Sequence, residues 1–190
     1  MSGDLHLRGE AISKGGLHDL KKWQHLQDLL SQTIKANISL FDGVGNYLTK
    51  PSQVTGFCAD FVRPVAPHVK PEIRCVMHAF QHFQLHESER IYTCPHKLRF
   101  ANSKIKRGDK TAFVIVIGPI LIGSRPNNDI CRAHCKELGI DPEIFCDRIR
   151  EIPLFSHQGL QIVTEFTEYL HQYLRLDESV EEKPSLESQP

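Results

Sequence analysis

The sequence predicts an α+β domain in which an antiparallel sheet is flanked by helices at both ends of the chain. Two observations indicate this class. Residues 17–34 and 156–176 carry apolar side chains at helical spacing. Between these two segments, short β-branched and aromatic runs are separated by turn-forming residues, a pattern typical of strands joined by hairpins.

The composition excludes several functional classes. The chain has 190 residues, enough for one domain, with 40% hydrophobic and 24% charged residues. Lys+Arg and Asp+Glu both number 23, so bulk charge favours neither nucleic acid nor an anionic membrane. The start lacks the apolar core of a secretion signal, and the longest apolar run, 112–123, is too short to span a bilayer. We therefore expect a cytoplasmic protein with reduced cysteines, without a disulfide framework.

The first half of the chain predicts one helix and two strands. The helix covers 17–34, with an apolar face that includes Trp23. A strand is expected at 38–41 and a second at 47–49, joined by the glycine-containing turn 42–46.

The second half predicts a helix, a group of strands and three more helices. Pro71 is suited to the first turn of a helix over 71–87. Strands are expected at 90–94, 98–105 and 111–117, with Gly118-Pro119 interrupting the last one before an edge segment at 120–122. Helices are expected at 127–138, 142–150 and 156–176, with caps at Asn127 or Asn128, Asp141 and Ser156.

These elements suggest a division of the chain into three parts. Residues 1–16 are polar and are expected to form a flexible leader. Residues 17–176 form the folded domain. Residues 177–190 are acidic and rich in Pro and Ser, which predicts a disordered tail or a linker.

Three separated cysteines are the main candidates for chemistry. Cys58 follows the first two strands, Cys75 lies at the start of a helix, and Cys94 lies near the end of a short strand. Their thiols either line a pocket for a small organic ligand or hold zinc or an iron–sulfur centre. A metal would need a fourth ligand, for which His78 and His96 are the nearest candidates.

Other side chains offer weaker signals. Aromatic residues near the cysteines form either a ligand cavity or plain core: Phe57, Phe61, Tyr92, Phe100 and Phe113. Cys131, Cys135 and Cys146 are expected to pack a pair of helices as small apolar groups. The row His78, His82 and His86 is expected on a solvated or partly covered helix face. No catalytic signature is present, so we do not expect an enzyme.

The last helix has a heptad pattern. Val163 and Leu170 are seven residues apart, as are Phe166 and Tyr173. This spacing predicts either a homodimer through the helix 156–176 or a helix packed against 17–34 of its own chain.

Taken together, these segments resemble the PocR sensory domain, a PAS-like ligand-binding module of prokaryotic signalling proteins. The resemblance covers about residues 20–176 and is carried by the helix around Trp23, the segment 38–49, Phe57-Cys58, Arg74-Cys75, Tyr92-Thr93-Cys94, 117–121 and 151–156. One departure is Lys97, which stands where the family usually has glycine after its third cysteine.

The resemblance implies a PAS-like sheet and a pocket for a small hydrocarbon derivative between the sheet and the helix 71–87. The candidate ligand contacts are Phe57, Cys58, Cys75, Tyr92, Cys94 and Phe113, and the candidate metal ligands are Cys58, Cys75 and Cys94. The implied partners are a histidine-kinase or DNA-binding output protein or domain, without direct binding to nucleic acid or membrane. An interaction scaffold with a filled interior is the remaining alternative.

Overall fold

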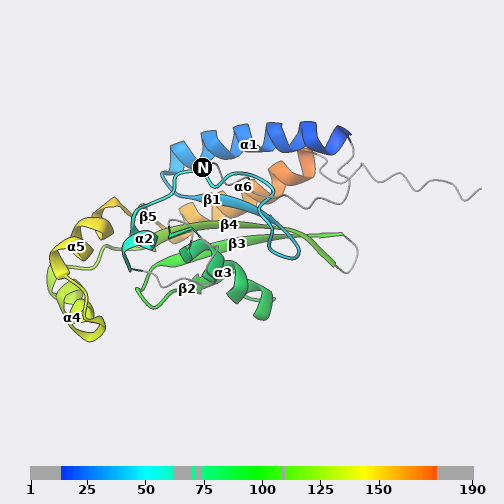
Figure 1. The fold of residues 1–190 in the computed structure, drawn as a ribbon. Coiled ribbons are helices and arrows are strands. Elements are labelled where there is room, and N and C mark those ends of the chain that lie inside the picture. Colours follow the sequence, from blue (N-terminus) through cyan, green and yellow to red (C-terminus); the bar gives the residue numbers. More distant parts are fainter. Residues whose placement is uncertain (1–13, 62–69, 72–73, 108–109, 175–190) are drawn as a thin grey trace, which may run out of the picture.

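A five-stranded sheet lies between two layers of helices (Figure 1). The computed structural model describes residues 14–61, 70–71, 74–107 and 110–174. In these residues the helices are α1 (Lys14–Ile34), α2 (Phe57–Phe61), α3 (Arg74–Leu85), α4 (Asn128–Leu138), α5 (Pro142–Glu151) and α6 (His157–Leu174). The strands are β1 (Ile38–Asp42), β2 (Ile91–Thr93), β3 (Arg99–Arg107), β4 (Lys110–Ile122) and β5 (Leu154–Phe155).

The sheet has the order β1-β4-β3-β2, and these neighbours are antiparallel. The short strand β5 pairs with the end of β4 in parallel. The segment after β1 runs back along it through isolated bridges at Tyr47 and Ser52. Together with the long helix α6, this arrangement confirms the predicted α+β class with a PAS-like sheet.

The two faces of the sheet bury different apolar cores. Because side chains alternate along a strand, Val114 and Val116 of β4 face one core, whereas Ile115 and Ile117 face the other. The first core lies under α2, α3, α4 and α5, and the second lies under α1 and α6. In Figure 1 the helices α1 and α6 lie above the sheet, α3 lies below it, and α4 and α5 stand at one end.

The predicted helix boundaries agree closely with the structure. Asn127 caps α4, Asp141 caps α5, and the hydroxyl of Ser156 accepts a hydrogen bond from the backbone of Gly159 at the start of α6. Gly139 ends α4 in the left-handed conformation, with φ of 65°. The helix α1 begins at Lys14, before its predicted start, and α3 is described from Arg74 onward.

The predicted interruption of β4 at Gly118-Pro119 is wrong. β4 continues through these residues. Arg99 pairs with Ile120 and Ala101 pairs with Ile117, so β4 has one residue more than β3 here, and this β-bulge accommodates Gly118-Pro119 within the strand. Gly118 has φ of 139°, and a Cβ there would lie 2.8 Å from the Arg99 carbonyl oxygen. Only glycine fits this position.

Two further local expectations differ from the structure. Residues 47–49 contribute only the isolated bridge between Tyr47 and Phe41 instead of a second strand. The helix α2 was not predicted, because its five residues are too few to show a helical period. Most of the predicted leader and the whole of the predicted tail lie outside the described residues.

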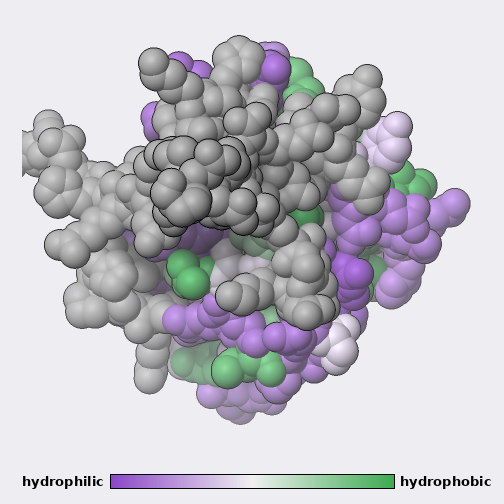
Figure 2. All heavy atoms as spheres, turned by 90° about the vertical axis from the view of Figure 1, so that its right-hand side faces the viewer, coloured by the Kyte–Doolittle hydropathy of each residue, from purple (hydrophilic) through white to green (hydrophobic). Residues whose placement is uncertain are grey.

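None of the helices in the described part of the chain is long and apolar enough to cross a membrane. Figure 2 shows one end of the molecule, where the visible hydrophobic residues form separate small patches among hydrophilic ones. Scattered patches of this kind are ordinary on a folded surface.

Candidate ligand-binding site

Five aromatic rings from four parts of the chain meet at the end of the sheet near α5. We call them the aromatic–histidine cluster: Phe57 and Phe61 of α2, His96 of the turn between β2 and β3, His134 of α4, and Phe145 of α5. Phe57 and Phe145 are fully buried, whereas the other three rings are partly covered.

Several ring pairs of the cluster contact edge to face, and the others are tilted. The Phe57 centroid lies 5.5 Å from that of His96 and 5.6 Å from that of Phe145. The His96 and His134 rings are perpendicular, with centroids 5.9 Å apart. Such edge-to-face contacts each add about 0.5–1.5 kcal/mol beyond the buried area, so the cluster fixes α2 against α4 and α5.

An ion pair holds the same elements together at the surface. Arg148 Nε of α5 donates to Asp60 Oδ2 of α2 at 2.6 Å. Arg148 also donates to Glu151 at 3.1 Å. The hydrogen bond to Asp60, and after it the one to Glu151, raise the pKa of the Arg148 guanidinium.

The two histidines introduce polar atoms into an apolar setting. His96 Nε2 donates to the carbonyl oxygen of Phe61 at 3.1 Å, so in the neutral ring Nδ1 is a hydrogen-bond acceptor. His96 Nδ1 and His134 Nε2 are both buried, and neither has a hydrogen-bond partner among the described residues. Burial lowers the pKa of His96, and nearby His134 lowers it further, so the neutral ring is favoured.

The turn that carries His96 is tightly closed. The backbone N–H of Cys94 donates to Leu98, and the N–H of Lys97 donates back to Cys94, both at 2.9 Å. Burial raises the pKa of the Cys94 thiol, which lies beside this turn. The turn therefore positions His96 through backbone geometry.

Four of the six predicted ligand contacts lie in or against the core under α3. Phe57, Cys75 and Cys94 are buried there, and Tyr92 packs against it. The side chain of Cys58 lies outside the described part of the structure. Phe113 was placed incorrectly: it packs against the opposite core, because it is one residue away from Val114 along β4 and alternate residues face opposite sides.

Tyr92 is covered by a histidine rather than open to a cavity. Its ring stacks on His82 with centroids 4.4 Å apart, and the His82 ring also lies 4.4 Å from that of His86. His82 Nε2 lies 2.7 Å from Glu89 Oε2, and this contact lowers the pKa of Glu89. The helix face that carries His82 and His86 is thus partly covered, as one of the sequence expectations stated.

The model of the sensory domain found in PocR matches residues 16–177. This match covers most of the chain. The chain belongs to the PocR sensory domain family. Neither the curated proteins nor the solved structures contain a significant match.

Lys97 has an unusual backbone conformation. Its φ of 63° lies in the left-handed region that favours glycine. The turn that presents His96 therefore carries a strained lysine where glycine would fit without strain.

A metal centre on the three predicted cysteines finds no support. Cys75 is disulfide-bonded, so the expectation of reduced cysteines is wrong for this residue. A disulfide sulfur offers no thiolate to a metal. Among the described residues, no group of three or more His, Cys, Asp or Glu side chains is arranged to hold a metal ion.

Sequence reasoning did not identify His134 and Phe145 as parts of this site. They come from α4 and α5, which look in sequence like an ordinary capped helix pair. Phe61 and His96 were singled out, but without their contact to each other. Only the packing of α4 and α5 against α2 brings these rings together.

Proposed function

We propose that this PocR domain binds a small, mainly apolar molecule carrying a hydroxyl group at the aromatic–histidine cluster. The observation that supports this ligand class is the acceptor Nδ1 of His96, which lies among aromatic rings without a partner in the described residues. A buried acceptor without a partner costs about 1–3 kcal/mol, and a hydroxyl donor would recover that free energy.

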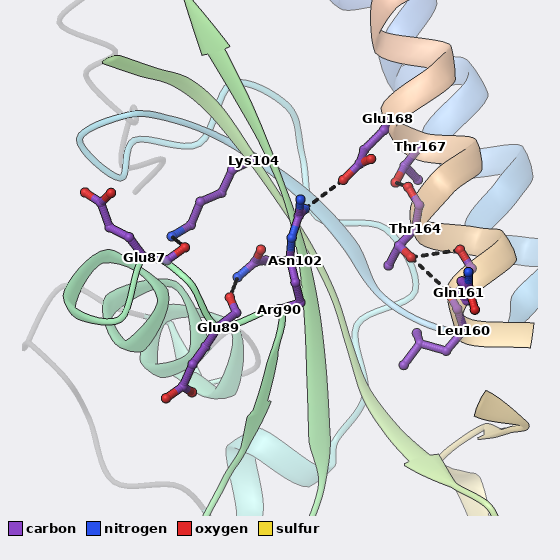
Figure 3. A network of polar contacts seen from close by, with 10 residues as sticks. All are labelled: Glu87, Glu89, Arg90, Asn102, Lys104, Leu160, Gln161, Thr164, Thr167 and Glu168. Carbon is purple, nitrogen blue, oxygen red and sulfur yellow. Dashed lines mark hydrogen bonds and ion pairs between the residues drawn. The ribbon is translucent and has the colours of Figure 1, made fainter. Parts of the chain in front are cut away.

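The elements around the cluster suggest how binding is reported. The helix α3 packs under the same core as the cluster, and its C-terminal end is bound to β3 by side chains (Figure 3). Lys104 Nζ donates to the carbonyl oxygen of Phe83 at 2.6 Å and to that of Glu87 at 3.0 Å. A cation at the C-terminus of a helix stabilises its exposed carbonyl groups.

The same region reaches the other face of the sheet. Asn102 of β3 donates through its side chain to the carbonyl oxygen of Glu89 at 3.0 Å. Arg90, which follows Glu89 in the chain, extends toward α6, where its Nη1 lies 2.7 Å from Glu168 Oε1 (Figure 3). A displacement of α3 would therefore change the position of Arg90 and the environment of α6.

We propose that α6 is the output element, acting on a histidine-kinase or DNA-binding partner. This role requires a ligand that binds two arrangements of the domain with different affinity. The Arg90–Glu168 pair is exposed and contributes little stability, so its proposed role is to couple positions rather than to hold the fold.

The dimer prediction through α6 remains a prediction, with a changed interface. Val163 packs against the domain's own core, so it is not available to a partner helix. The exposed apolar residues are Ile162, Phe166 and Tyr169, at helical spacing on the outer side of α6. Light scattering of the wild type and of Phe166→Glu tests whether this stripe joins two copies.

Binding is tested by thermal unfolding with a panel of short-chain alcohols and with alkanes of the same size. A ligand that binds the folded state at 100 times its Kd stabilises it by about 2.7 kcal/mol. We expect stabilisation by at least one alcohol, no effect of its matched alkane, and loss of the effect in His96→Phe.

His86→Phe is the matched control, because His86 is an exposed histidine outside the cluster. It should keep the full response to the alcohol. Equal stabilisation by alcohol and alkane, or an unchanged response in His96→Phe, would contradict the proposed ligand class.

A further inference from the structure

The helix pair α4–α5 carries a second group of reactive side chains, separate from the three cysteines predicted to bind a ligand. Cys131 and Cys135 of α4 are buried, and Cys146 of α5 is partly buried against them. All three are free thiols. Burial first, and then the neighbouring Cys146, raise the pKa of Cys131 to about 11.

Cys146 lies against the turn of α4 that carries Cys131. Asn128 and Arg132, which flank Cys131 on α4, line one groove together with Cys146, and Cys146 packs against the buried cluster that contains Cys131. Cys135 is also close to both, but it lies one turn from Cys131 on the same helix. Residues four apart on a helix have Cβ atoms about 5–6 Å apart, whereas a disulfide needs about 3.5–4.5 Å. A disulfide across the two helices is therefore favoured, and Cys131 is its partner for Cys146 because Cys131 lies between the two α4 residues, Asn128 and Arg132, that line the groove with Cys146.

Cys146 also lines an open groove on the outer side of the helix pair. The groove has a volume of about 340 Å³, and Arg132, Arg150, Glu143, Asp147 and Asn128 line it beside Cys146. Arg150 and Asp147 pair with each other at 2.6 Å, so Arg132 and Glu143 are the groups that complement a small molecule carrying both charges. Arg150 also favours the ionised form of the adjacent Cys131 thiol.

We propose that Cys146 is a site of thiol–disulfide exchange with a low-molecular-weight zwitterionic disulfide, and that Cys131 resolves the resulting adduct. The Cys146 thiolate attacks one sulfur of the small disulfide, whose S–S bond breaks and releases one thiolate. Cys131 then loses its proton and attacks Cys146 Sγ, which releases the second thiolate. In sum, two cysteine thiols are oxidised to one disulfide, and the small disulfide is reduced to two thiols.

The position of this pair gives the reaction a structural consequence. His134 of α4 and Phe145 of α5 both belong to the aromatic–histidine cluster, and they lie on the helices that the new bond would join. Oxidation would restrict the relative movement of α4 and α5 at the cluster. The exchange itself does not depend on the proposed ligand, so the two proposals can fail separately.

The test uses the full chain, reduced and then exposed to oxidised glutathione. Trypsin cleaves after Arg132, Lys136 and Arg148, so Cys131, Cys135 and Cys146 fall in three different peptides. We expect mass spectrometry to find the peptides of Cys131 and Cys146 linked, irrespective of the state of Cys75.

Three variants separate the two steps. Cys131→Ser should accumulate a glutathionyl group on Cys146, because the resolving thiol is absent. Cys146→Ser should lose both the adduct and the link, and the control Cys135→Ser should form the link as the wild type does. Thiols that stay free in the wild type, an adduct first formed on Cys131, or a link to Cys135 would overturn the proposal.

A measurement on the unmodified protein covers the case in which a variant fails to fold. In native protein, iodoacetamide should label Cys146 faster than Cys131 and Cys135 by on the order of tenfold, because thiolate character and access set the rate. Equal rates at the three thiols would overturn the assignment of Cys146 as the attacking group.

Discussion

The two faces of the sheet each bury a polar cluster, and the two clusters are satisfied to different degrees. On the face under α1 and α6, the buried Gln27 is saturated with hydrogen bonds. Its Oε1 accepts from Trp23 Nε1 and Thr49 Oγ1, and its Nε2 lies within hydrogen-bond distance of the Ile38 and Lys50 carbonyl oxygens and the Ser52 hydroxyl. This network binds α1 to β1 and to the segment that runs back along it.

On the face under α2, α3, α4 and α5, the polar atoms of the aromatic–histidine cluster are only partly satisfied. His96 Nδ1 and His134 Nε2 lie among phenylalanine rings with no partner in the described residues. A saturated network favours one fixed arrangement, whereas an unsatisfied one has free energy to gain from a ligand. In the function proposed above, the first face serves stability and the second serves recognition.

The largest expected effect is on the saturated face. Gln27→Met keeps the length of the side chain but leaves Trp23 Nε1 and Thr49 Oγ1 without their acceptor. Because each orphaned group costs about 1–3 kcal/mol, we expect a loss of about 3 kcal/mol in the free energy of unfolding, measured in urea.

Gln32→Met on the exposed side of α1 is the control and should change stability by less than about 0.5 kcal/mol. A loss below about 1 kcal/mol in Gln27→Met would mean that the network is not important for stability.

The second effect is a pH dependence on the recognition face. Because burial lowers the folded-state pKa of His96, the unfolded chain binds more protons than the folded one between that pKa and the ordinary value of about 6.5. Stability should therefore be fully present above about pH 6.5 and fall as the pH drops toward the folded-state pKa.

In His96→Phe this part of the pH dependence should disappear, with a change of less than about 1 kcal/mol near pH 8. Urea unfolding at several pH values measures both quantities. An unchanged slope in the variant would show that His96 is not the titrating group.

The third effect concerns the turn that presents His96. Lys97→Gly should stabilise the domain by about 0.5 kcal/mol, because glycine removes the left-handed strain at a smaller cost in chain entropy. Lys97→Ala keeps the strain but removes the charge, so it should not stabilise. Equal gains in both variants would assign the effect to charge rather than to the backbone.

The smallest effect joins the two faces. Arg90→Gln should lower stability by only about 0.3 kcal/mol, because its pair with Glu168 is exposed. Its effect should instead appear in hydrogen exchange of α6, which should no longer respond to a ligand bound at the cluster. A full response of α6 in this variant would exclude the Arg90–Glu168 pair from the coupling.

The sequence by itself determined the elements that depend on near neighbours in the chain. The caps at Asn127, Asp141 and Ser156 could be predicted because each involves hydrogen bonds within a few residues. The same locality explains why the α+β class and the family resemblance could be predicted.

The tertiary structure alone decided which side chains meet. Phe113 was assigned to the wrong face of the sheet. Alternation shows that adjacent residues of a strand face opposite sides of the sheet, but it does not show which side is covered by which helices. The bulge at Gly118 depends on the pairing with β3, and the contact of His96 with His134 and Phe145 depends on how α4 and α5 pack. Contacts between segments distant in the chain are set by packing of the whole core, which no local pattern encodes.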